Sequence, residues 1–398
     1  MIHDLGEVYY SQKTQDEHIE LKAIRVDASG TILSERTVIR TGQKVDGQTV
    51  VRLGKYDLNR KGELLVVIHH ELSVKVPTID DRGRVTGEQF AQTQMLCLDT
   101  GSGIRGLVKE GDTALDGHRM LGSFSNVVIH DDSQVVFTAD YLHFLGEQGG
   151  QPQYDPRQGL FTQQPGSHPV LVVHNDALII QELGSSSIAR FGLVDLHDHG
   201  NLVVQVHTLQ APKPTAQSLP HEAPKSQTVL LQGNLKKLQA TLPLGGLQSP
   251  PHAAGVRKQG IGGSAVRFGP RAGGLNATGY VLSTGKQQQL LVRDQVLYQT
   301  GDTSPEGNTV TGSLPPVMGS AGEVYFVLST QTGYELCAYN GQERRTLLRS
   351  GAILTPGGSP IDRIWLGSVT QQLDRVGRLA FVVTHQDNRA SVVLGLPV

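Results

Sequence analysis

The densest group of potential metal ligands in the sequence is the segment Asp195-Leu196-His197-Asp198-His199, with His207 beyond it. Histidine nitrogens and carboxylate oxygens together suit zinc or a similar ion. Alternate residues of a strand lie on one face, which would place Asp195, His197 and His199 side by side. The same segment also occupies a turn of a repeated pattern, so a turn that binds no metal is the alternative interpretation.

A second candidate site depends on where strands begin. Asp57, Asn126 and Asp195 all lie early on strands that would be the inner strands of a repeat protein. Carboxylate and amide oxygens bind Ca²⁺, and a bound cation can polarise an ester carbonyl for hydrolysis. The matching positions of the other units carry no acid. We therefore expect no cofactor, and we keep calcium as the cation to test.

The sequence contains no established catalytic motif to set beside these residues. It lacks a G-x-S-x-G elbow, a P-loop, an H-E-x-x-H helix motif and an EF-hand loop. The acidic pairs at Asp80-Asp81 and Asp131-Asp132 are typical of turns. The expectation is a protein without catalytic activity.

A repeat in the sequence positions these residues. At five turns, the residue four before a Gly or Ser is apolar, and so are the residues two and four after it. Strands with one buried face require this period of two. The turn residues are Gly62, Ser133, Gly200, Gly322 and Gly377.

The repeat predicts an all-β fold, a six-bladed β-propeller of four-stranded blades. The 47 Gly, 19 Pro and 18% charged residues agree with many short strands joined by turns. We expect an N-terminal arm at 1–18 and one propeller domain at 19–398, with a weakened pattern in the fourth blade. N-terminal strand material would complete the C-terminal blade and close the ring, which removes exposed sheet edges. The predicted blade cores lie near residues 63, 131, 198, 260, 320 and 375.

The turn pattern resembles that of bacterial tandem-repeat β-propellers. The shared signals are G-D, then L-G, then a D/N-x-x-G turn before an aliphatic and aromatic strand. The best copies run from Gly111-Asp112 to Phe137 and from Gly301-Asp302 to Phe326. The Asp is absent after Gly42 and Gly351, which favours a loop-supporting role for it. The resemblance implies a fold and no catalysis.

Two excursions, 77–92 and 210–227, interrupt the repeat. The second holds four prolines and lacks periodicity, as expected of an exposed loop. Long loops on a rigid scaffold often carry binding residues. We expect these excursions to contact a partner protein, and their candidate residues are Pro77, Asp81, Arg84, Pro212, Pro214, Pro220 and Pro224.

Charge and composition limit the partners and the compartment. A net charge of −2 argues against nucleic acid as the partner. No signal peptide or membrane-spanning run is apparent, which predicts a soluble, cytoplasmic protein by default and leaves an extracellular or virion-exposed location open. Cys97 and Cys337 are expected to be buried free thiols.

Three functions follow from these observations. The first is a non-catalytic interaction or structural subunit within a larger assembly, because turns and core are regular and catalytic spacing is missing. The second is a calcium-type hydrolase with its site in a central tunnel. The third is a surface or virion protein that binds a glycan or receptor, although one Trp, ten Tyr and nine Phe provide few platforms for sugar stacking.

Overall fold

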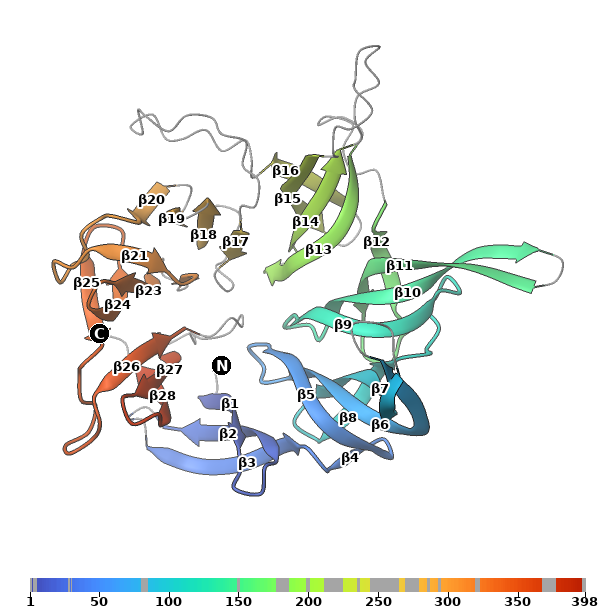
Figure 1. The fold of residues 1–398 in the computed structure, drawn as a ribbon, viewed down its shortest axis with the longest axis horizontal. Helices are drawn as coiled ribbons and strands as arrows, with labels where there is room; N and C mark the ends of the chain where they lie inside the picture. The colour runs from blue at the N-terminus through green and yellow to red at the C-terminus, as the bar shows by residue number, and fades with distance from the viewer. Residues whose placement is uncertain are drawn as a thin grey trace, which may run out of the picture. The chain divides into compact units, whose positions relative to one another are not determined.

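The computed structural model is all-β, which confirms the predicted fold class. The residues that it describes form 28 strands and no helix (Figure 1). Within this described part, no helix is long and apolar enough to cross a membrane. The described residues are 2, 6–27, 29, 31–79, 85–148, 151–176, 186–197, 201–210, 225–234, 237–243, 265–268, 279–284, 287–292, 295–318, 323–366 and 377–395.

The chain divides into two compact units. Unit 1 consists of Met1–Gly6 and Asp176–Val398, and unit 2 consists of Glu7–Asn175. The single propeller domain at 19–398 therefore stays a prediction.

Unit 2 contains three antiparallel sheets, and in each the neighbouring strands follow one another along the chain. The first sheet holds β1 (Glu7–Lys13), β2 (Ile19–Val26) and β3 (Ile32–Arg40). The second holds β4 (Lys44–Val45), β5 (Gln48–Leu58), β6 (Leu64–Ile79), β7 (Val85–Asp99) and β8 (Ile104–Lys109). The third holds β9 (Arg119–Ile129), β10 (Val135–Gln148), β11 (Gln151–Gln163) and β12 (Val170–His174).

The core of unit 2 lies between its second and third sheets. Alternate residues of β6, Leu65 and Val67, pack with alternate residues of β10, among them Phe137 and Tyr141. The Phe137 ring stacks on Phe161 of β11 at 5.7 Å between centroids. Burying each such side chain contributes about 1.5–3 kcal/mol. Leu64 and Val66, the residues of the repeat, are buried as well, so both faces of β6 are buried at this place.

Unit 1 contains four further antiparallel sheets. The first consists of β13 (Ser186–His197), β14 (Asn201–Gln210), β15 (Lys225–Asn234) and β16 (Lys237–Pro243). The second consists of β17 (Ala265–Phe268), β18 (Gly279–Thr284), β19 (Gln287–Val292) and β20 (Gln295–Gln299). The third consists of β21 (Val310–Ser313), β22 (Val317–Met318), β23 (Val324–Thr330), β24 (Gly333–Tyr339) and β25 (Arg344–Arg349). The fourth consists of β26 (Ile361–Trp365), β27 (Leu379–His385) and β28 (Ala390–Gly395).

The strand register follows the repeat seen in the sequence. At four of the five turn positions, the residue four after the turn pairs with a residue at which the ladder to the next strand is interrupted by a register shift. A shift of this kind is typical of a β-bulge, which bends the strand and increases its twist. The pairs are Val66 with Cys97, Phe137 with Phe161, Val204 with Leu231, and Phe326 with Cys337.

The number of blades is not confirmed, because the described strands form seven sheets. Six of them correspond to the predicted units, and β1–β3 form the seventh. The segment interpreted as an N-terminal arm contains β1, whose residues pair with β2 from Glu7↔Arg25 to Lys13↔Ile19. Closure of a ring through the C-terminal blade stays a prediction. The predicted core of the fourth unit, residue 260, lies outside the described residues. The first two described strands of this unit, β17 and β18, flank residues 269–278, further along the chain.

Both cysteines are buried and free, as predicted. Burial raises the pKa of the Cys97 thiol, and it raises the pKa of the Cys337 thiol to about 12. Because the thiolate is the reactive form, both side chains behave as small apolar residues in their sheets.

Candidate functional site

The predicted cation ligand Asp57 connects two sheets of unit 2. It lies near the end of β5, is 1% exposed, and accepts a hydrogen bond from the backbone amide of Ile129 in β9 at 2.9 Å. A buried carboxylate stays ionised at low cost only where donors satisfy it. The acid therefore has a structural task that its spacing in the sequence does not reveal.

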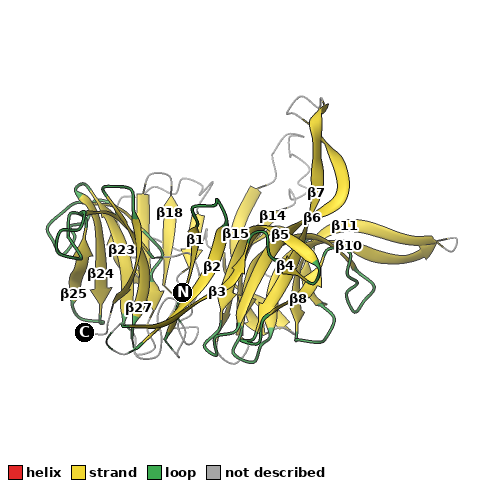
Figure 2. Cartoon of the chain, turned by 90° about the horizontal axis from the view of Figure 1, so that it is seen from below, coloured by secondary structure: helices red, strands yellow, loops and turns green. Residues whose placement is uncertain are grey.

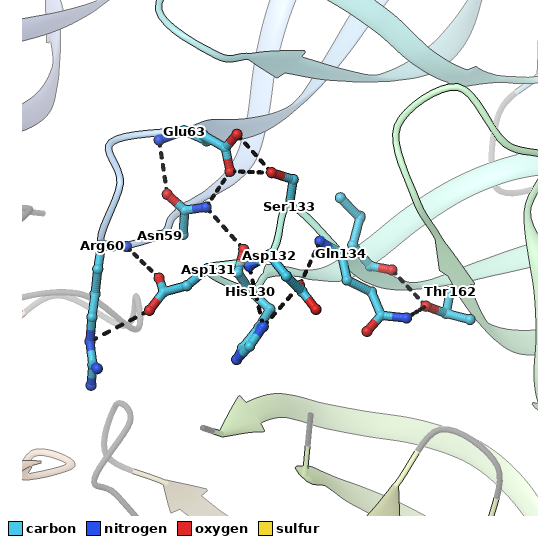
Figure 3. A network of polar contacts seen from close by, with 10 residues as sticks. Asn59, Arg60, Glu63, His130, Asp131, Asp132, Ser133, Gln134 and Thr162 are labelled. Carbon is cyan, nitrogen blue, oxygen red and sulfur yellow. Dashed lines mark hydrogen bonds and ion pairs between the residues drawn. The ribbon is translucent and has the colours of Figure 1, made fainter. Parts of the chain in front are cut away.

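The turns that follow β5 and β9 are joined by side chains (Figure 3). The buried amide of Asn59 accepts from the backbone amides of Lys61 and Glu63, and its Nδ2 donates to the carbonyl oxygen of His130 at 2.9 Å. The Ser133 hydroxyl donates to the Glu63 carboxylate at 2.7 Å. Side chains of the first turn thus hold the backbone of the second.

Charged groups complete this network. The Asp131 carboxylate accepts from the Arg60 amide at 2.8 Å, and Asp132 accepts from the amide of Gln134 at 3.0 Å. The pKa of Asp132 is lowered because the hydrogen bonds from His130 and Gln134 outweigh the cost of burial. These contacts stabilise the turn, as predicted for the Asp131-Asp132 pair, whereas Asp80-Asp81 lies outside the described residues.

Asn126, the second predicted tunnel residue, also serves its own sheet. Its φ is 48°, and its Nδ2 donates to the Thr138 hydroxyl of β10 at 3.2 Å. Asn tolerates the left-handed region better than most residues. Register shifts in the β9–β10 ladder fall at this place.

The structure separates His207 from the other members of the predicted histidine cluster. In the β13–β14 ladder His197 pairs with Asn201, while His207 pairs with Arg190, seven residues earlier on β13. At 3.3 Å per residue, that separation is about 20 Å along the strand. Burial and the neighbouring Arg190 lower the pKa of His207.

The rest of this cluster is only partly described. Asp195 and His197 belong to β13, and their side chains are outside the description, as is residue His199. Among the residues that the structure describes, no three His, Cys, Asp or Glu side chains are placed to hold a metal ion. Metal binding at the predicted cluster stays a prediction.

The interpretation of 77–92 as a loop is wrong for most of its length. Pro77 pairs with Glu88 inside a ladder that runs on to Ile79 and Val85. In a two-stranded ribbon each strand has a free edge, where the missing amide hydrogen of a proline breaks no bond. Asp81 and Arg84 lie outside the described residues, as do Pro212, Pro214, Pro220 and Pro224 of the second excursion.

Two ribbons of unit 2, β6–β7 and β10–β11, extend past the rest of their sheets (Figure 2). β10 pairs with β9 only as far as Leu142, and β11 pairs with β12 only from Gly159 onward. We call residues 143–158, without 149 and 150, the β10–β11 ribbon. Leu145 in it is 60% exposed and Tyr154 is 39% exposed.

Proline protects the outer edge of this ribbon. The amide of Gln158 points to the β12 side, where it donates to the Asn175 side chain at 3.0 Å. Backbone groups two residues apart on a strand point the same way, so Pro156 and Pro152 remove two outward donors. Prolines at a free edge oppose pairing with another strand. Contacts made by this ribbon would then depend on side chains.

Three histidines gather where the ribbon leaves its sheet. His118 precedes β9, His143 lies in β10 and His174 ends β12. The ring centroids of His118 and His143 are 4.5 Å apart, and those of His143 and His174 are 5.6 Å apart. We call these three residues the histidine cluster. Tyr141 lies beside it, with its hydroxyl 3.3 Å from Nδ1 of His143.

The sequence analysis missed this histidine cluster. Its members are far apart in the chain, and a bulge and two turns decide whether they meet. One local signal was available: Tyr141 and His143 alternate on a strand, which places them on the same face.

Comparisons with known proteins identify no family for the chain. No protein-family model matches it, and no curated protein matches it. The resemblance to tandem-repeat propellers is therefore without support at the level of sequence.

Solved structures that the chain matches include the Dos1 propeller, with 10% identity, a TM-score of 0.36, and 97% of this chain and 75% of that chain covered. Polysaccharide lyase Uly1 matches with 10% identity and a TM-score of 0.43 over 99% and 90%. Prolyl oligopeptidase B from Galerina marginata matches with 9% identity and a TM-score of 0.40 over 99% and 52%. The chain spans about half the length of that oligopeptidase. At these TM-scores, none of the three likenesses bears on the function of this chain.

Proposed function

We propose that the protein is a non-catalytic interaction module that binds another protein through the β10–β11 ribbon. The observation that carries the proposal is a ribbon with exposed Leu145 and Tyr154 beyond the edge of its sheet. Apolar side chains at the end of a rigid element favour contact with a partner, because their burial on binding releases ordered water. The hydrolase and glycan-recognition alternatives stay predictions.

The ribbon is stiff enough to present those side chains. The rings of Phe144 and Tyr154 contact each other across the two strands, tilted by 53° with 5.7 Å between their centroids. Phe144 also lies over Gly117, where an added Cβ would be 3.4 Å from its ring. A partner therefore meets a pre-ordered surface, which lowers the entropy cost of binding.

The contacts of the predicted cation ligands also support the proposal. The Asp57 carboxylate holds the amide of Ile129, and Asn126 holds the hydroxyl of Thr138. These bonds give both residues a role in connecting strands of unit 2, and this role accounts for them without a cation.

Photo-crosslinking in the native cells tests the proposal. A benzophenone amino acid replaces Leu145 in one variant and Leu33 of β3 in the control, because the two leucines are 60% and 59% exposed in the same unit. We expect one prominent protein adduct at position 145 and none at position 33. Equal labelling at both positions, or no adduct at 145, would contradict the proposal.

A further inference from the structure

The imidazole of His118 contacts the base of the β10–β11 ribbon, where the ribbon leaves its sheet. Nδ1 of His118 accepts a hydrogen bond from the backbone amide of Phe144 at 3.2 Å. Phe144 lies two residues past Leu142, the last residue of β10 that pairs with β9. His118 itself is 6% exposed and ends a tight loop in which its carbonyl oxygen accepts from the amide of Ala114.

This contact requires a neutral imidazole. A ring nitrogen that accepts a hydrogen bond carries no hydrogen, so the proton of His118 sits on Nε2. Protonation adds a hydrogen to Nδ1, and the amide of Phe144 then faces a donor in place of an acceptor. The same proton brings a positive charge into a buried position.

The surroundings of His118 oppose that charge. On the same loop Asp116 is the one carboxylate that favours it. β10 contributes Tyr141 and His143, and β12 contributes His174. β11 contributes Arg157 and Asp155, which bond to each other at 3.0 Å and so offset one another.

We propose that the histidine cluster is a pH-sensitive clamp, which holds the base of the β10–β11 ribbon at neutral pH and releases it on acidification. The first proton on His118 breaks the bond to Phe144. A second proton on His143 adds repulsion between the rings of His118 and His143, whose centroids are 4.5 Å apart. The importance of the clamp for binding rests on the function proposed above, but the release is a property of the isolated protein.

The titration behaviour agrees with this geometry. Burial lowers the pKa of His118, and His174 lowers it further, against the opposing effect of Asp116. Burial, His118, Arg157 and His174 lower the pKa of His143, against Asp155. Both rings are therefore neutral in the clamped state at pH 7.5.

Hydrogen exchange of the purified full chain at pH 7.5 and pH 5.5 tests the clamp. The segment 141–148 reports on the bond to Phe144, and the strand β23 in unit 1 is the internal control. After correction for the intrinsic pH dependence of exchange, we expect protection of 141–148 to fall roughly tenfold relative to β23. Equal changes in both segments would overturn the proposal.

Matched variants identify the responsible ring. In His118→Asn, an amide oxygen can accept from Phe144 without titrating, so the pH-dependent loss should disappear. The control His168→Asn alters an exposed histidine and should retain the full loss. If His118→Asn impairs folding, His143→Asn is used in its place, and this variant should show a smaller loss of exchange protection in 141–148 at pH 5.5. A full loss in a folded His118→Asn or His143→Asn protein would contradict the clamp.

The exchange experiment and the crosslinking experiment can fail separately. A ribbon that loosens at low pH in a protein without an adduct at position 145 would sustain the clamp and reject the binding function. An adduct at position 145 together with pH-independent exchange would support the binding function and reject the clamp.

Discussion

At the scale of single residues, polar side chains in unit 2 hold separate turns together. Asn59 shows this best, because its amide bonds both to its own turn and to the His130 carbonyl of the next sheet. Asn340 has the same role in a turn of unit 1 without the second connection: its oxygen accepts from the amides of Gln342 and Glu343. A comparison of Asn59 with Asn340 therefore distinguishes the stability gained within a turn from the stability gained by linking two sheets.

Replacing Asn59 by Ala should therefore destabilise the protein more than replacing Asn340 by Ala. The part-buried backbone groups that bond to the Asn59 side chain lose their partners, and the total cost should be about 1–3 kcal/mol. At the exposed Asn340, water replaces the lost bonds, and we expect about 0.5 kcal/mol. Urea denaturation of the two variants measures the difference, and equal losses would contradict a link between the sheets.

At the scale of elements, a close approach of side chains to backbone fixes where β11 lies. Gly159 pairs with Ala139 on one side and with His174 on the other. A Cβ at Gly159 would lie 2.7 Å from Leu171, 2.8 Å from Phe161 and 2.9 Å from Tyr141. The absence of a side chain at this position allows the aromatic core to close over the strand.

Gly159→Ala should consequently overpack the core of unit 2. The buried Phe161 and Tyr141 and the partly buried Leu171 have to shift at once, and such insertions cost about 1–3 kcal/mol. Gly395→Ala is the matched control, because its new Cβ would meet atoms only at 3.7 Å or beyond. Thermal unfolding should show a lower Tm for Gly159→Ala alone, and an unchanged Tm would reject the overpacking argument.

The ribbon edge allows a second prediction at this scale. Replacing both Pro152 and Pro156 by Val restores two outward amide donors on β11. We expect this variant to self-associate by strand pairing, while the native chain resists it. Size-exclusion chromatography at increasing concentration measures the effect. Identical elution of both proteins at all concentrations would show that the prolines do not protect the edge.

At the scale of the whole molecule, several histidines make folding sensitive to acid. Burial lowers the pKa of five of them in the folded protein: His69, His70, His118, His143 and His207. Their unfolded values are near 6.5. Between the folded and unfolded values the unfolded chain binds more protons, so the free energy of unfolding falls as the pH falls.

Stability should accordingly be complete above about pH 7 and decrease as the pH drops through 6.5. Between pH 7.5 and 5.5 we expect Tm to fall by about 2–4 °C for each kcal/mol lost. Differential scanning calorimetry in buffers of equal ionic strength measures this. A Tm that is constant or rises toward pH 5.5 would contradict the neutral state of these histidines.

The sequence by itself determined the strands and their faces. Apolar residues two and four positions after each turn are enough to predict an all-β chain, because burial of one face is a local requirement of every strand. The pairing of Val66 with Cys97 and of Phe326 with Cys337 shows that the two cysteines occupy equivalent places in their sheets. The six predicted units do not include β1–β3, because this part of the sequence lacks the turn spacing of the repeat, and the number of blades stays a prediction.

Only the tertiary structure decided which polar side chains meet. Asp57 bonds to Ile129 from 72 residues away, and His118 reaches Phe144 across the β9–β10 hairpin. The same holds for the ribbons, since the sequence around Pro77 and Pro156 is equally compatible with a loop. The physical reason is that periodicity specifies the face on which a side chain lies, whereas its neighbours on that face depend on hairpin length, bulges and the packing of one sheet on the next.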